Sequence, residues 1–242
     1  MALIIAHRGA SAYAPENTVA ACELAVQMGA DMIELDVLCS ADGELVVFHD
    51  DTTERWDGRP RSVGSCSLAE LRELDIGGER VATLAEICEL SRRSGIALNV
   101  ELKRPDIVGP TVAMIHEFGI AKRVIVSSFY ELALAELLRS APDIERAYLM
   151  GTESYRLDVR ARELWPFLAL KRVKAQAWHP YFDLPAVEQV IPLARKAGYA
   201  VNVWTIDDPE VMRRMVACGA TGIITNKPDV ARAALAAGAS AD

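Results

Sequence analysis

The sequence has no surplus of basic side chains, no long apolar run and no closely spaced pair of cysteines. Its 242 residues include 34 acidic and 26 basic side chains, which leaves a formal net charge of -8. Such an acidic chain argues against a broad nucleic-acid footprint and against a polybasic membrane surface, since both need a basic patch. No apolar stretch approaches the ~20 residues that a membrane helix requires. We therefore expect no nucleic-acid partner and no stable membrane insertion.

The five cysteines are odd in number and widely separated, so they match neither zinc nor redox motifs. We expect them to be reduced and mostly buried. The apolar start of the chain has no positively charged leader and meets His7 after too few residues for a signal peptide. These features predict a cytoplasmic location. With 51% hydrophobic residues, the chain can bury a core of its own, which excludes disorder as a description of the whole.

Short apolar runs alternate with helical patterns along the whole length. The predicted strands are Leu3–His7, Met32–Leu38, Ala97–Glu101, Val124–Ser127, Arg146–Leu149, Ala175–Trp178, Ala200–Trp204 and Gly222–Ile224. The predicted helices are Thr18–Met28, Leu84–Ser94, Val108–Phe118, Glu131–Arg139, Arg156–Trp165, Leu184–Ala197, Pro209–Cys218 and Pro228–Ala237. Eight such units in about 250 residues predict an α/β fold, a TIM-like (β/α)8 barrel with parallel strands and crossover helices. An open doubly wound sheet is the alternative.

We predict one catalytic domain over residues 1–242, interrupted after the second strand. Residues 40–80 contain a hairpin signal at Asp42-Gly43, a polar run, and a short helical pattern over Ser67–Leu74. Insertions of this size on a barrel usually carry function. We therefore expect residues 40–80 to form a hairpin and an insertion over the barrel mouth.

Two acidic residues share one face of the second predicted strand. Side chains alternate along a strand, so Glu34 and Asp36 point the same way. If Asp42-Gly43 is a two-residue hairpin turn, Asp36 lies directly opposite His49 and shares its face. Because the rest of the strand is apolar, the carboxylate pair favours a bound divalent cation over a solvated strand face. Oxygen ligands indicate Mg or Ca rather than zinc.

The third predicted strand ends in alternate charged residues. Glu101 and Lys103 share a face at the carboxyl end of an apolar strand, where barrels of this class carry their catalytic side chains. Glu101 can complete a three-carboxylate metal site, and Lys103 can meet an anion beside it. Taken alone, the two residues would rather indicate a surface ion pair, but their position favours a site.

The first predicted strand delivers His7 and Arg8 to the same mouth. The guanidinium of Arg8 has the fork geometry that suits phosphate. His7 and His49 would flank the anion site, and two imidazoles in this position can serve as general acid and general base near neutral pH. The other two histidines lack such company: we expect His116 on a helix surface and His179 near the barrel rim.

Seven motifs occur in an order that is typical of one known family. They are His7-Arg8-Gly9, Pro15-Glu16-Asn17-Thr18, Glu34-Leu35-Asp36-Val37, Asp42-Gly43 with His49-Asp50, Glu101-Leu102-Lys103, Val203-Trp204-Thr205 and Gly222-Ile223-Ile224-Thr225-Asn226-Lys227-Pro228. Over residues 4–229 the chain resembles the glycerophosphodiester phosphodiesterases. The resemblance implies a TIM-like barrel that hydrolyses a small-molecule glycerophosphodiester to glycerol 3-phosphate and an alcohol.

The resemblance also implies a role for single residues. It implies Glu34, Asp36 and Glu101 as the ligands of a divalent cation, and His7 and His49 as the acid/base pair. It also implies that Arg8 and Lys103 bind the phosphate and that Trp204 lies on the glycerol side. Glu16 would orient the first-strand loop. The sequence departs from the family pattern after His49-Asp50, at Ala82 and at Asn226. The first departure alters the insertion that would cover the alcohol group. Because barrels often pair, a homodimer is a possible assembly.

Other functions share the predicted barrel. A lysophospholipase D-type phosphodiesterase would need an apolar rim, whereas the polar run of the insertion, residues 50–64, offers only Trp56 and Val63 among many polar residues. A non-catalytic barrel that binds phosphorylated ligands would be indicated by loss of a histidine or carboxylate, and all are present. A sugar-phosphate isomerase would need a phosphate loop after the last two strands, where Asn226-Lys227-Pro228 lacks a glycine cradle.

Overall fold

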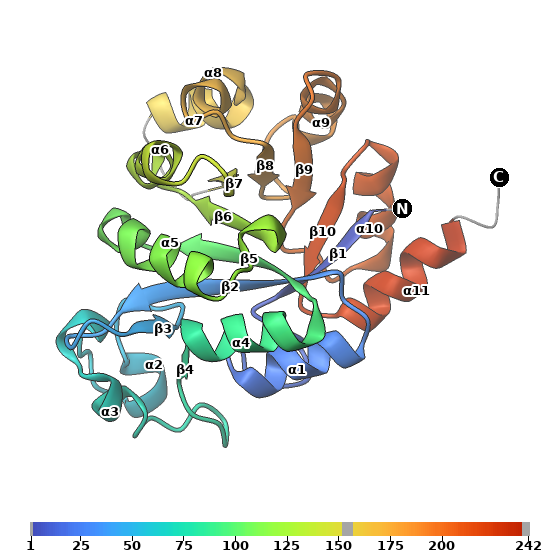
Figure 1. The fold of residues 1–242 in the computed structure, drawn as a ribbon. Helices are drawn as coiled ribbons and strands as arrows, with labels where there is room; N and C mark the ends of the chain where they lie inside the picture. The colour runs from blue at the N-terminus through green and yellow to red at the C-terminus, as the bar shows by residue number, and fades with distance from the viewer. Residues whose placement is uncertain (1, 152–156, 239–242) are drawn as a thin grey trace.

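Eight parallel strands close into a barrel in the computed structural model, which describes residues 2–151 and 157–238 (Figure 1). The barrel strands are β1 (Leu3–His7), β2 (Met32–Cys39), β5 (Ala97–Leu102), β6 (Val124–Ser128), β7 (Glu145–Met150), β8 (Ala177–Pro180), β9 (Ala200–Val203) and β10 (Gly222–Thr225). Pairing of β1 with both β2 and β10 closes the ring. The predicted TIM-like barrel is therefore confirmed, and the open sheet is excluded.

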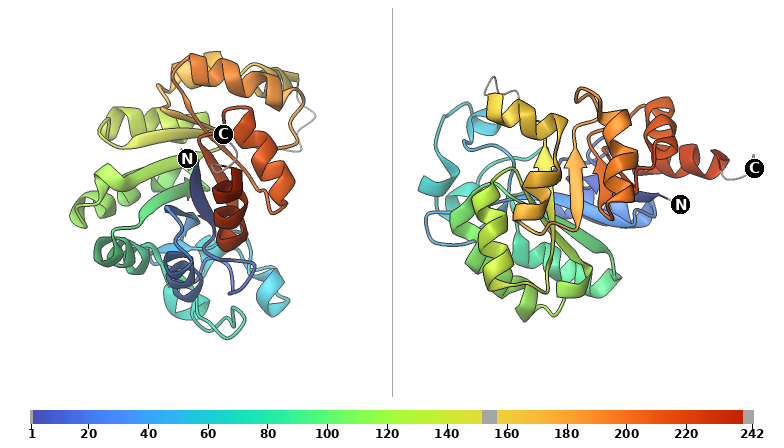
Figure 2. Two further views of the ribbon diagram at one scale, coloured as in Figure 1. Left: turned by 90° about the vertical axis from the view of Figure 1, so that its right-hand side faces the viewer. Right: turned by 90° about the horizontal axis from the view of Figure 1, so that it is seen from above.

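Helices follow the strands and surround the barrel, as the two further views in Figure 2 show. They are α1 (Val19–Gln27), α4 (Leu84–Ser94), α5 (Val108–Glu117), α6 (Glu131–Ser140), α7 (Leu157–Leu164), α8 (Phe167–Arg172), α9 (Val187–Lys196), α10 (Pro209–Ala217) and α11 (Pro228–Gly238). Short 3-10 turns at Pro105–Ile107 and Ala121–Arg123 precede α5 and β6. In the described ranges, no helix combines the length and the apolar character that crossing a membrane would take.

Two differences from the predicted elements have local causes. The predicted helix over Arg156–Trp165 corresponds to α7, although Arg156 lies outside the described residues. The chain then forms α8, whose six residues are too few to display a helical period in the sequence. The strand predicted over Ala175–Trp178 begins two residues later and ends at Pro180, whose carbonyl accepts a hydrogen bond from the Trp204 amide at 3.1 Å.

The segment after β2 folds beside the barrel. Its elements are β3 (Leu45–Val47), α2 (Glu54–Asp57), a 3-10 turn (Val63–Ser65), α3 (Leu68–Leu71) and β4 (Ala82–Thr83). They enclose a small apolar cluster of their own that includes Phe48, Leu71 and Val81. Figure 1 places this insertion at the end of the barrel toward which β2 points. The carboxyl ends of the parallel strands lie at that end.

The hairpin of β2 and β3 has a different register from the predicted one. The expectation that Asp36 lies directly opposite His49 is wrong by one residue. Between Ser40 and Glu44 the loop has three residues instead of two, and its last residue, Gly43, has a φ of +87°. A type I turn followed by a left-handed glycine adds that third residue, and the added residue moves the register.

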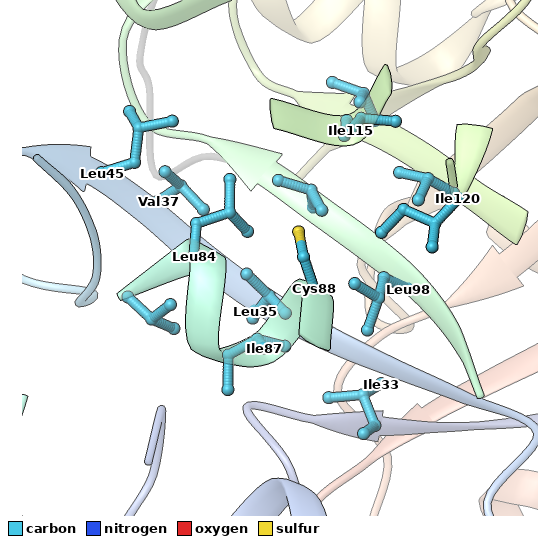
Figure 3. Packing of buried hydrophobic residues seen from close by; sticks show 14 of the residues in the cluster. Ile33, Leu35, Val37, Leu45, Leu84, Ile87, Cys88, Leu98, Ile115 and Ile120 are labelled. Carbon is cyan, nitrogen blue, oxygen red and sulfur yellow. The ribbon is translucent and has the colours of Figure 1, made fainter. Parts of the chain in front are cut away.

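Apolar side chains fill the space between the strands and the helices (Figure 3). Where α4 covers β2 and β5, the fully buried side chains are Leu84, Ile87, Cys88, Leu35 and Leu98. The helix begins at Thr83, whose side chain and that of Glu86 each accept a hydrogen bond from the other residue's backbone amide. It ends at Gly95, which has a left-handed conformation. Local capping and apolar burial thus agree on the position of α4.

Gly9 carries the chain from β1 into the first loop, and we expect it to tolerate no side chain. Its φ is +84°, and a Cβ atom there would lie 2.6 Å from the backbone carbon of Ala21 in α1. Gly43 has a similar φ of +87° but open space around it. Alanine at Gly43 should lower the free energy of unfolding by about 1–2 kcal/mol, which is the cost of left-handed backbone. Alanine at Gly9 should cost more, because α1 must also move.

Denaturant unfolding of Gly9→Ala and Gly43→Ala, side by side, measures this difference. Equal losses in the two variants would contradict the steric role of Gly9.

Candidate active site

A cavity of about 180 Å³ opens among the carboxyl ends of the strands. It is lined by His7, Arg8, Glu34, His49, Asn99, Glu101, Lys103, Phe129, Leu149, Trp204 and Ile224. Seven of the nine residues that the sequence predicts for the site are therefore on its wall. The other two, Asp36 and Glu16, lie behind the wall in contact with Arg8.

Three carboxylates meet at the bottom of the mouth. Glu34 and Asp36 extend from β2, and Glu101 extends from β5 at the register position paired with Asp36. One oxygen atom from each lies within 4.8 Å of the others, and all three residues are buried. This closeness follows from the strands, because alternate residues of β2 share a face and the parallel ladder aligns β5 beside it.

Two cationic side chains, Lys103 and Arg8, lie beside the three carboxylates. Lys103 Nζ lies 3.3 Å from Asp36 Oδ1 and 3.0 Å from Glu101 Oε1, and Arg8 Nε lies 3.1 Å from Asp36 Oδ2. Burial opposes ionisation of Asp36, but Lys103 and Arg8 hold the pKa of that carboxyl well below its usual range. Burial and Asp36 raise the pKa of Glu101 to about 7. The pKa of Glu34 is also raised, by burial and by its two acidic neighbours.

A divalent cation fits this donor set. Three buried carboxylates supply hard oxygen ligands, and two of them bind protons more tightly than usual when no cation is beside them. Oxygen ligands of this kind suit Mg or Ca, whereas zinc prefers nitrogen and sulfur. The three carboxylates that the sequence predicts as metal ligands therefore lie close enough together to share one cation.

Asn17 holds Asp36 in place, a role that the sequence prediction missed. Its Nδ2 donates to Asp36 Oδ2 at 2.9 Å, and its Oδ1 accepts from the Asp36 backbone amide at 3.3 Å. Asn17 has a φ of +59°, which asparagine tolerates better than most residues. The next residue, Thr18, caps α1. The signal was present in the Pro15-Glu16-Asn17-Thr18 motif, but its partner on β2 could not be identified from sequence.

The hydrogen bonds around His7 determine which of its nitrogens carries the proton. Asn226 Nδ2 donates to Asp207 Oδ2 at 2.6 Å, so Asn226 Oδ1 must act as the acceptor for His7 Nδ1 at 2.7 Å. The proton therefore resides on Nδ1, and the lone pair of Nε2 faces Glu34, 3.9 Å away. Burial, with the charge of Arg8, lowers the pKa of His7 to about 4. The ring is thus a neutral hydrogen-bond acceptor near pH 7.

His49 occupies the outer side of the cavity. It follows β3, and its Nδ1 lies 2.7 Å from Asp50 Oδ1, which leaves Nε2 for the cavity. Its side chain is 35% exposed, against 18% for His7. The other oxygen of Asp50 pairs with Arg55 of α2 at 2.7 Å. The sequence prediction gave neither Asp50 nor Arg55 a role, because both lie in the segment that departs from the family pattern or borders it.

The opposite wall of the cavity is aromatic and apolar. Trp204 Nε1 donates to the backbone carbonyl of His179 at 2.9 Å, and the Trp204 ring meets Phe129 edge-on at 5.7 Å between centroids. The expectation that His179 lies near the rim is wrong. Its side chain is fully buried inside the barrel against Asn202, and burial lowers its pKa to about 3. His116 lies exposed on α5, as expected, paired with an aspartate.

Asn99 is a further lining residue that the sequence prediction passed over. It is fully buried on β5, next to Glu34 in the ladder, and both ends of its amide are without a hydrogen-bond partner among the described residues. Unpaired buried amides are costly, so such a residue seldom persists without a role. The signal was the alternation of Asn99, Glu101 and Lys103 along one strand face.

Comparison with known proteins identifies the family. The sequence profile of the glycerophosphoryl diester phosphodiesterase family matches residues 7–230. The chain belongs to this family. A glycerophosphodiester phosphodiesterase of Caldanaerobacter subterraneus subsp. tengcongensis is 35% identical over 241 residues, which cover 94% of this chain and 95% of the relative. The predicted resemblance is confirmed, and the protein is a phosphoric diester hydrolase.

Solved structures of the family share the fold. A crystal structure from Silicibacter pomeroyi, provisionally assigned to the same activity, has a TM-score of 0.91 at 27% identity, over 99% of this chain and 94% of the other. A phosphodiesterase of Oleispira antarctica, solved with its product sn-glycerol-3-phosphate, has a TM-score of 0.83 at 28% identity, over 97% and 96% of the two chains.

Replacing Asn226 by aspartate should raise the pKa of His7. In Asn226→Asp, a carboxylate replaces the amide oxygen beside Nδ1 and stabilises the protonated ring by about one pKa unit or more. Titration followed by the imidazole ¹⁵N signals measures this, and Asn226→Leu is the control in which the pKa should stay low. A pKa of His7 that is the same in both variants would contradict the proposed hydrogen-bond network.

Proposed function

We propose that this phosphodiesterase hydrolyses small glycerophosphodiesters to glycerol 3-phosphate and an alcohol, with a divalent cation held by Glu34, Asp36 and Glu101. In the same proposal His7 and His49 are the general base and the general acid. One observation carries the proposal: two imidazoles, two cationic side chains and two carboxylates of the buried cluster, Glu34 and Glu101, line a single small cavity. Each of these groups has a task in phosphodiester hydrolysis.

Arg8 and Lys103 suit the binding of the phosphodiester. A phosphodiester carries one negative charge, and its transition state gathers more on the equatorial oxygens. Arg8 lines the cavity with its guanidinium anchored by Glu16, whose Oε1 accepts from Nη1 at 3.0 Å. Lys103 is held by the carboxylates and also lines the cavity. A cation at the carboxylates would supply Lewis-acid stabilisation of the same oxygens.

His7 suits the role of general base. Its neutral ring presents the bare Nε2 toward the carboxylates, and the Asn226 contact keeps that nitrogen in place. It can accept a proton from the attacking oxygen at this position. A residue that must be deprotonated before it acts is well served by burial, which disfavours the charged ring.

His49 suits the role of general acid. It lies on the more exposed side of the cavity, where the alcohol leaves, and Asp50 fixes the orientation of its ring. Protonated on both nitrogens, it can donate from Nε2 to the departing alkoxide. Trp204 and its apolar neighbours then remain for the glycerol group on the facing wall.

A cytoplasmic location is part of the proposal and has indirect support. All five cysteines are free, and Cys22, Cys66 and Cys88 are buried, as expected for a reducing compartment. A homodimer also stays a prediction, which size-exclusion chromatography with light scattering can test. No observation favours the lysophospholipase D-type alternative, because the described part of the insertion encloses its apolar residues in its own cluster.

Removal of divalent cations should abolish turnover. Release of glycerol 3-phosphate from glycerophosphocholine is expected to cease with excess chelator and to return when Mg or Ca is added. Glu101→Gln should bind the cation more weakly in isothermal titration calorimetry, and Glu89→Gln, an exposed carboxylate of α4, is the matched control. Full activity after exhaustive chelation would refute the metal requirement.

Loss of either histidine should lower kcat by about 10²- to 10⁴-fold, which is the range for general acid–base groups. His7→Ala and His49→Ala are compared with His116→Ala, whose ring is exposed on α5 and does not line the cavity. A substrate with a nitrophenolate leaving group separates the two roles, because it needs no general acid. On that substrate His49→Ala should recover most of its rate and His7→Ala should not. Recovery by His7→Ala instead would reverse the assignment.

A further inference from the structure

We infer that Arg55 is a positioning residue that joins the insertion to the first-strand loop, and so sets His49 and Arg8 relative to each other. The inference rests on the proposed function, since His49 and Arg8 act there on one substrate. Arg55 lies in α2, whereas its two partners lie in different segments of the chain. It neither lines the cavity nor belongs to the carboxylate cluster.

One guanidinium binds two carboxylates. Arg55 Nη2 donates to Glu16 Oε1 at 2.5 Å, and Arg55 Nε lies 2.7 Å from Asp50 Oδ2. The guanidinium carbon also lies 4.6 Å from the centre of the Trp56 ring, which restricts where the side chain can go. Arg55 is therefore held on three sides.

Each carboxylate continues to a residue of the site. Asp50 uses its second oxygen to hold His49 Nδ1 at 2.7 Å. Glu16 uses the same Oε1 that Arg55 contacts to hold Arg8 Nη1 at 3.0 Å. The chain of contacts thus runs from one proposed catalytic histidine to the proposed phosphate-binding arginine, with Arg55 at its centre.

The charges agree with this arrangement. Burial acts against the ionised form of Glu16, but hydrogen bonds and charge from Arg55 and Arg8 lower the pKa of that carboxyl. Without Arg55, Glu16 and Asp50 would each keep one cationic or imidazole partner and lose the bridge between them. Lysine cannot replace the bridge fully, because a single ammonium lacks the planar fork that reaches two carboxylates at once.

Arg55 adds an ionic link between the insertion and the first-strand loop, which also approach each other where Gly77 lies against Pro15. Part of its apolar residues form a separate cluster, whereas Leu45, Val47 and Ala82 of β3 and β4 belong to the core of the barrel. His49 is the residue of the insertion that lines the cavity. A small rotation of the insertion would move His49 relative to groups on the barrel strands. Displacements of about 1 Å can cost about a hundredfold in rate.

The test compares Arg55→Met and Arg55→Lys with Arg61→Met in the full chain. Arg61 is the matched control, since it lies in the same insertion, is similarly exposed and forms an ion pair with Asp57 at 2.8 Å. With glycerophosphocholine and added Mg or Ca, Arg55→Met should lower kcat about 10- to 100-fold and raise KM severalfold. Arg55→Lys should fall in between, and Arg61→Met should match the wild type in both constants.

The two constants together distinguish positioning from general destabilisation. A smaller folded fraction lowers kcat and leaves KM unchanged, whereas a broken bridge disturbs His49 and Arg8 and so changes both. Addition of free guanidinium at low millimolar concentration to Arg55→Ala should restore part of the rate. Wild-type kcat and KM in a folded Arg55→Met variant would overturn the inference, and so would a change in kcat alone. If Arg55→Met does not fold, Arg55→Lys decides by the same two constants.

Failure of the proposed function would appear separately, as a wild-type protein that releases no glycerol 3-phosphate. In that case the imidazole ¹⁵N signals of His49 test the positioning role of Arg55. These should change in Arg55→Met and stay as in the wild type in Arg61→Met. An unchanged His49 signal in Arg55→Met would overturn it independently of any activity.

Discussion

Repulsion among three buried carboxylates is the constraint on which the barrel mouth depends. Glu34, Asp36 and Glu101 approach because their strands are neighbours, and neither β2 nor β5 can move without opening the barrel. The surroundings therefore have to offset the repulsion. Asp36 is contacted by Asn17, Arg8 and Lys103, and Lys103 also pairs with Glu101. The loop after β1 supplies two of those three groups, Arg8 and Asn17.

That loop is strained, which shows how strongly the carboxylates determine it. Among the described residues other than glycine, positive φ angles occur at four positions, and two of them are Arg8 and Asn17. Such a conformation costs of order 1–3 kcal/mol, less for asparagine than for arginine, and persists where the surroundings enforce it. Both residues contact Asp36, so the enforcing contact is the same in the two cases. The strain places a guanidinium and an amide where an unstrained loop would not.

The parts of the structure that could be predicted from sequence are those that follow from local periodicity. The barrel follows from eight alternations of strand and helix, and the shared face of Glu34 and Asp36 follows from strand alternation. The predicted register of the hairpin was wrong because the register depends on the length of the loop and on the left-handed conformation of Gly43. The Asp42-Gly43 turn signal specifies neither. The contact of His7 with Asn226 joins residues 219 positions apart and exists only because β1 and β10 close the ring. No local pattern could reveal it.

The two histidines come from parts of the molecule with different mechanical support. His7 ends a barrel strand that pairs on both sides, so its position is fixed together with the carboxylates. His49 belongs to an insertion that has its own small core, and it reaches the cavity beyond the end of β3. The run that departs from the family pattern, which includes α2, lies in that insertion. In the proposed mechanism, sequence change there would alter the side of the cavity that faces the alcohol, through Asp50 and Arg55. The carboxylates proposed to hold the cation stay on β2 and β5. On that proposal, the barrel strands hold the groups that phosphodiester hydrolysis itself requires, and the insertion holds the groups that can vary with the leaving group.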